Sequence, residues 1–127
     1  LKELFLENLY TAKWGGTMLL TEADAGSDVG ALTTSAKKLP DGTWAITGNK
    51  IFITNAGDAE TYVVLARTDK EAQKHHGISA FIVEKGTPGF SFGKKEENSE
   101  KEEACSGASF AASCCAASVA KQMFAQF

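Results

Sequence analysis

The sequence predicts a mainly β domain, an antiparallel β-barrel or sandwich, with a helix in front of it. Three observations favour this class. Short runs rich in β-branched and aromatic residues are separated by Gly, Pro and Asp turns. Apolar and polar residues alternate within these runs, which is the period of a half-buried strand. Long helical patterns between the strands, which a parallel nucleotide-binding sheet requires, do not occur in the sequence.

The first predicted element is a helix over residues 1–13. Its apolar residues fall near one helical face: Leu4, Phe5, Leu9 and Ala12. The glycine pair after Trp14 is expected to end this helix. Residues 17–21, "TMLLT", then predict a short buried strand that runs into the small-residue loop "EADAGSD".

Four further runs predict the remaining strands, at residues 31–39, 43–55, 61–68 and 78–85. The turn "PDG" separates the first two of them, and "GTPGF" turns the chain after the last. Alternation within the second run sends four residues to one side of the sheet: Trp44, Ile46, Phe52 and Thr54. Gly48 inside the same run indicates a second turn or a bulge.

The last part of the chain has a different composition. Residues 94–103 are a run of charges, and residues 104–120 are rich in Ala, Ser and Cys. The alanine content permits a helix there, although no amphipathic stripe supports one. The cysteines match neither a disulfide framework nor a zinc spacing, and adjacent His75 and His76 cannot face one metal as an i, i+4 pair. We expect free thiols and no metal site.

Length and charge exclude several classes of protein. The chain has 127 residues, which suits one small domain, and a net charge of -3 argues against a general nucleic-acid binder. Residues 104–120 lack the Leu, Ile and Phe content of a membrane span. The start "LKELFLENLY" carries two Glu and no cleavage site, so it is a poor signal peptide. A cytosolic or organelle-matrix protein is expected.

Hydroxyl groups at strand ends are the main candidates for ligand binding. Thr21 ends one apolar run and Thr54 ends another, so a flat heteroaromatic ligand could meet hydroxyl and N–H donors at its edge. Ser27 and its glycine-containing loop could meet a phosphate or ribityl group. The alternative is that each Thr is simply a strand former. The loop carboxylates Glu22 and Asp28 are expected to accept hydrogen bonds from their own turns.

Several motifs taken together resemble the middle domain of the acyl-CoA dehydrogenases. They are "TEADAGSD", "GNKIFITN", "VVLART" and "FIVEKGTPGF", in the family's order and spacing, and the likeness runs from Trp14 to Asn98. The resemblance implies three parts: the end of a helical domain at 1–13, an incomplete β-barrel middle domain at 14–98, and a low-complexity tail without family match at 99–127. The family's later strands are not recognisable after Asn98, so the barrel is expected to be truncated and the tail unrelated to it.

The same resemblance implies a flavoenzyme of fatty acid metabolism. Such oxidoreductases of β-oxidation remove hydrogens from Cα and Cβ of an acyl-CoA by proton abstraction and hydride transfer to FAD. They pass electrons to an electron-transfer flavoprotein and form homo-oligomers. They work in the bacterial cytoplasm or the mitochondrial matrix.

Carried over by motif position, the resemblance assigns these residues to the cofactor: Met18, Leu19, Leu20, Thr21, Gly26, Ser27, Phe52, Ile53 and Thr54. Thr21 would reach the pyrimidine edge of the flavin, Thr54 would lie near its hydride-accepting nitrogen, and Ser27 would also lie near the thioester. No catalytic residue is implied, because the family's base belongs to a C-terminal helical domain. Two departures are Ala23-Asp24, where the family has Pro followed by Gly or another residue, and Phe52, where it commonly has Trp.

Two other readings remain open. The chain could be a β-barrel binding module that holds an aromatic ligand without redox chemistry, or a non-functional fragment. We expect the 127 residues alone not to oxidise acyl-CoA, because general-base catalysis needs a group within hydrogen-bond reach of the proton. Weak FAD binding is expected.

Overall fold

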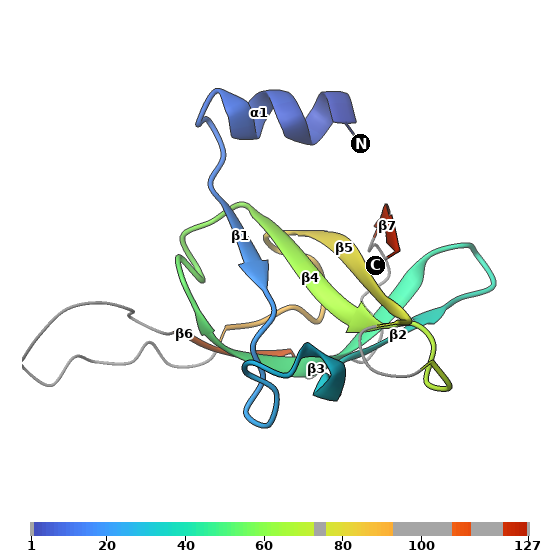
Figure 1. Cartoon of the computed structure of the whole chain (residues 1–127). Coiled ribbons are helices and arrows are strands. Elements are labelled where there is room, and N and C mark those ends of the chain that lie inside the picture. Colours follow the sequence, from blue (N-terminus) through green and yellow to red (C-terminus); the bar gives the residue numbers. More distant parts are fainter. Residues whose placement is uncertain (1, 73–75, 93–107, 113–120, 127) are drawn as a thin grey trace, which may run out of the picture.

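The computed structural model describes residues 2–72, 76–92, 108–112 and 121–126. The elements in chain order are a π-helical turn (Lys2–Leu6), α1 (Glu7–Tyr10), β1 (Gly16–Leu19), a 3-10 turn (Val29–Ala31), β2 (Ser35–Lys38), β3 (Trp44–Ile53), β4 (Thr61–Arg67), β5 (Ile78–Glu84), β6 (Ala108–Ala112) and β7 (Lys121–Gln126). The strands form one seven-stranded sheet in the order β6-β3-β2-β4-β5-β7, with β1 paired to β4 off this path (Figure 1). The predicted mainly β class is confirmed, and the described strands do not close into a barrel.

The N-terminal helix is confirmed, but it ends earlier than expected. Its last residue is Tyr10, and the chain reverses at Ala12, which has a φ of 55°. The N–H groups of Lys13 and Trp14 both donate to the carbonyl of Asn8, each at 3.0 Å. A left-handed residue is a common helix terminator, so this turn stops the helix before the glycine pair is reached. Figure 1 shows the helix apart from the sheet, joined to it by the segment that leads into β1.

β4 is the centre of the sheet. It pairs with β5 in antiparallel register from Thr61↔Glu84 to Arg67↔Ile78. On its other edge β1 and β2 both run parallel to it, β1 beside Thr61–Val64 and β2 at Arg67. The sheet is therefore antiparallel at most pairs and parallel at these two. The buried side chains around β4 form the core: Leu19, Ile53, Tyr62, Val64, Ala66, Phe81 and Val83.

β3 carries a bulge that overturns the simple alternation expected for it. Its pairing with β6 shifts register between Lys50 and Ile53, and Phe52 has a φ of 55°. Lys50 and Ile53 are buried, whereas Phe52 is exposed, so Phe52 does not share a side with the buried Ile46. An extra residue in one strand reverses the facing of the residues after it.

Gly48 is needed for close approach and makes no turn. The strand continues through it, and a Cβ there would lie 2.7 Å from the Cα of Thr34. The expected turn or bulge at Gly48 is therefore wrong, and the irregularity lies at Phe52 instead.

Two described segments of the tail are strands. β6 pairs with β3 and β7 pairs with β5, both in antiparallel fashion. The expectation of a helical tail is wrong for these segments. Unpaired backbone groups at the edges of β3 and β5 accept added strands, and this pairing outweighs the helix preference of alanine.

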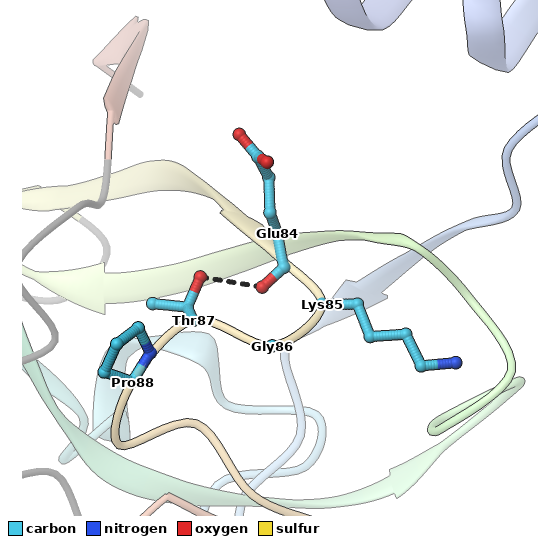
Figure 2. A pocket seen from close by; sticks show the side chains of 5 residues that line it. All are labelled: Glu84, Lys85, Gly86, Thr87 and Pro88. Atoms are coloured by element: carbon cyan, nitrogen blue, oxygen red, sulfur yellow. Dashed lines mark hydrogen bonds between the residues drawn. The ribbon is translucent and has the colours of Figure 1, made fainter.

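The turn after β5 follows the sequence prediction. Its residues line a hollow of about 230 Å³, and the hydroxyl of Thr87 donates to the carbonyl of Glu84 at 2.7 Å. Figure 2 shows the residues around this hollow and the hydrogen bond between them. Beyond the turn, the ring of Phe90 packs edge-on against Tyr62, with centroids 4.8 Å apart. The turn therefore brings the chain back onto the core.

Candidate functional site

Two segments that are far apart in the sequence lie side by side in the structure. The hydroxyl of Thr17 donates to the carbonyl of Thr54 at 2.7 Å, and the N–H of Ile51 donates to the carbonyl of Thr21 at 2.9 Å. These bonds join residues 17–21 to residues 51–54 in antiparallel directions. The expectation that "TMLLT" and "IFIT" belong to one site requires this adjacency.

Each of these two segments carries one large apolar side chain that is exposed. Met18 is 58% exposed and Phe52 is 59% exposed, while Leu19 and Ile53 point into the core. Leu20 packs against the smaller cluster of Ala25, Leu32 and Ile78. Of the predicted apolar site residues, Met18 and Phe52 are therefore exposed, Leu19 and Ile53 belong to the main core, and Leu20 packs against the smaller cluster.

Three predicted hydroxyl groups remain available to a ligand. Thr21 is partly buried, and Thr54 and Ser27 are exposed. Within the part of the chain that the structure describes, none of these three hydroxyls makes a hydrogen bond. A Cβ on Gly26 would meet nothing within 4 Å, so packing inside the described chain does not require glycine there.

The loop from Thr21 to Thr34 is held by a buried ion pair that the sequence reading missed. Glu22 and Lys50 have side chains only 4% and 1% exposed, and Nζ of Lys50 lies 2.7 Å from Oε1 of Glu22. Burial raises the pKa of Glu22, but hydrogen bonds from Lys50, Thr33 and Thr34 outweigh it and bring the pKa to about 2. Burial also lowers the pKa of Lys50 below 10.5, which Glu22 partly offsets.

The sequence did contain one signal for this pair. Lys50 lies four residues after the buried Ile46 in β3, so the alternation of a strand places both side chains on the inward side. A lysine at an inward position needs a buried anion. The expectation that the loop carboxylates serve their own turns is confirmed for Asp28, which accepts from the N–H of Gly30 at 2.9 Å. It is wrong for Glu22, whose partners Thr33, Thr34 and Lys50 lie far from it in the sequence.

The described residues were also compared with the requirements of a metal site and of a membrane-spanning helix. Among the described residues, no group of three or more His, Cys, Asp or Glu could hold a metal ion. The three cysteines and His75 lie outside the described residues. No described helix has the length and apolar character to cross a membrane.

Comparison with known proteins identifies the family. A family model described as the acyl-CoA dehydrogenase middle domain matches residues 17–111. The chain belongs to the acyl-CoA dehydrogenase family. The match extends beyond Asn98 and includes most of β6. The short-chain specific acyl-CoA dehydrogenase of Megasphaera elsdenii is 51% identical over 96 residues, which cover 76% of this chain and 25% of that protein.

Solved structures of related proteins share the fold of this chain. Butyryl-CoA dehydrogenase from Megasphaera elsdenii superposes with a TM-score of 0.76 at 46% identity, covering 86% of this chain and 27% of that one. A complex of PigA with FAD superposes with a TM-score of 0.73 at 35% identity, covering 86% and 28%. The chain thus spans about a quarter of the length of the relatives it matches.

Proposed function

We propose that this chain is the FAD-binding portion of an acyl-CoA dehydrogenase that oxidises acyl-CoA thioesters at Cα–Cβ. The observation that carries the proposal is the adjacency of residues 17–21 and 51–54, which places exposed Met18 and Phe52 beside hydroxyls that bond to nothing else in the described chain. The PigA complex with FAD, which has the same fold, supports the choice of cofactor.

The residues present fit a flavin. An isoalloxazine has apolar faces and a polar edge, and it needs side chains of both kinds on neighbouring segments. Met18 and Phe52 provide apolar contact, and Thr21 and Thr54 provide hydroxyls at opposite ends of the paired segments. Gly26 and Ser27, on the exposed loop, suit the ribityl and phosphate part, because a loop without a bulky side chain lets a ligand approach the backbone.

The bound FAD supplies the acceptor for the hydride that leaves the substrate. The role of this chain is to hold the ring and stabilise the negative charge that arrives on it. Thr21 and Thr54 act as hydroxyl donors whose backbone is fixed, because the N–H of Ile51 donates to the carbonyl of Thr21 and the hydroxyl of Thr17 donates to the carbonyl of Thr54. Donors fixed before the reaction stabilise developing charge without reorganisation. Met18 and Phe52 exclude water from the ring.

The rest of the proposal follows from the family. Ser27 lies near the thioester, and the base that removes the α proton is not among these 127 residues. The isolated chain therefore has no acyl-CoA turnover of its own. Electrons pass to an electron-transfer flavoprotein, the protein works as a homo-oligomer, and it acts in a bacterial cytoplasm or a mitochondrial matrix.

Titration of FAD with the purified chain tests the proposal. We expect a perturbed flavin absorption spectrum and a Kd on the order of micromolar or weaker. Thr21→Val and Thr54→Val should each weaken binding several-fold. Thr47→Val, which changes an exposed threonine of the same strand outside the site, is the matched control. An unperturbed flavin spectrum would contradict the proposal and favour a non-functional fragment. An equal loss of FAD affinity in all three variants would show that residues 17–21 and 51–54 do not form the site.

A further inference from the structure

The buried Glu22–Lys50 pair has a geometry that goes beyond holding a loop. We propose that it is a positioning pair for the flavin site, which fixes Thr21 and the Ser27 loop against the strand that carries Phe52 and Thr54. The inference rests on the proposed function and adds to it two positioning residues that do not touch the cofactor themselves.

Lys50 holds both neighbours of Thr21. Its Nζ donates to the carbonyl of Leu20 at 3.0 Å and to Oε1 of Glu22 at 2.7 Å. The next residue of β3, Ile51, donates its N–H to the carbonyl of Thr21 at 2.9 Å. Two successive residues of β3 therefore bind three successive residues of the other segment. This arrangement leaves the Thr21 backbone little freedom relative to Phe52.

Glu22 closes the loop at its far end. Its Oε2 accepts from the N–H of Thr33 at 2.7 Å and from the hydroxyl of Thr33 at 2.6 Å. Its Oε1 accepts from the N–H of Thr34 at 3.0 Å as well as from Lys50. One carboxylate thus ties the start of the loop to its end, and Ser27 lies between these two fixed points.

Stability alone does not explain an ion pair at this position. Two buried charges lose their hydration, and well-packed apolar residues of similar volume are often as stabilising. Apolar side chains, however, cannot make directional bonds to the carbonyl of Leu20 and to the N–H groups of Thr33 and Thr34. A constellation that must be held within a fraction of an ångström needs supporting residues of this kind. The pair therefore serves geometry at the site.

The test compares FAD binding by the full chain and by four variants. Lys50→Met removes the ammonium and Glu22→Gln removes the carboxylate charge, whereas Thr33→Val deletes one hydroxyl bond to Glu22 at an exposed position. Val83→Ala creates a cavity in the main core cluster, to which the loop does not belong. It is the control for a loss of stability that leaves the ion pair intact. Each protein is measured for Tm, for Kd by FAD titration, and for the bound-flavin absorption spectrum.

We expect Lys50→Met and Glu22→Gln to weaken FAD binding at least tenfold and to shift the bound spectrum, and Thr33→Val to weaken binding about threefold. Val83→Ala should lower Tm and leave Kd and spectrum unchanged. If the two charge variants fold and bind like the unaltered chain, the inference is wrong. If the two charge variants do not fold, the inference is wrong when Thr33→Val binds FAD like the unaltered chain. Absence of FAD binding by the unaltered chain would instead overturn the proposed function, and the inference with it.

Discussion

The buried carboxylate of Glu22 predicts a specific loss of stability in acid. Its pKa is about 2 in the folded chain against 4.5 for an ordinary glutamate. A pKa difference of about 2.5, at about 1.4 kcal/mol for each pKa unit, corresponds to roughly 3 to 4 kcal/mol. Because the folded pKa is the lower one, this contribution is complete above pH 4.5 and is lost as the pH falls toward 2. Glu22→Gln removes the titrating group.

The assay is urea unfolding at several pH values, followed by the fluorescence of Trp14 and Trp44. At about pH 6 the variant should be less stable than the unaltered chain by roughly 3 to 4 kcal/mol, since Lys50 is left buried without its anion. The gap should narrow steadily toward pH 2. Glu71→Gln, at an exposed position, should follow the unaltered chain throughout. A gap that stays constant across this range would refute the reasoning.

Three more predictions concern the side chain of Phe52, the close approach at Gly48 and the turnover of acyl-CoA by the purified chain. Phe52→Ala should weaken FAD binding several-fold. It should leave the unfolding midpoint in urea nearly unchanged, because the ring is exposed and the backbone of Phe52 is strained at a φ of 55°. A large loss of stability would contradict this prediction. Gly48→Ala should lower the free energy of unfolding by about 1–3 kcal/mol, because its Cβ would overlap the backbone of Thr34. Urea titration measures this, and unchanged stability would show that the backbone of Thr34 can move away. The purified chain with FAD and butyryl-CoA should not reduce a dye acceptor above the rate with FAD alone, and measurable turnover would show that a base exists within these residues.

Strands β4 and β5 could be predicted from the sequence because their burial depends on local pattern. Thr61–Arg67 and Ile78–Glu84 are runs of β-branched, aromatic and small residues that end at polar turns, so the signal is contained in the segment itself. The turn after β5 was also predictable, since Gly86 and Gly89 have a φ of 82° and glycine is favoured there.

Other features depend on contacts that no local pattern records. The bulge at Phe52 requires a positive φ in a bulky residue, which tertiary structure imposes against local preference. The tail strands β6 and β7 form by pairing with β3 and β5, and their alanine-rich composition points to a helix instead. The ion pair joins residues that are 28 positions apart, so only the inward parity of Lys50 hinted at it.

The central claim is that residues 17–21 and 51–54 together form the flavin site. The most direct measurement is NMR of the methyl-labelled chain during titration with FAD. We predict that the methyl signals of Met18, Thr21 and Thr54 shift together with one Kd, while those of Val83 stay in place. Shifts confined to other methyl groups, or no shifts at all, would contradict the claim.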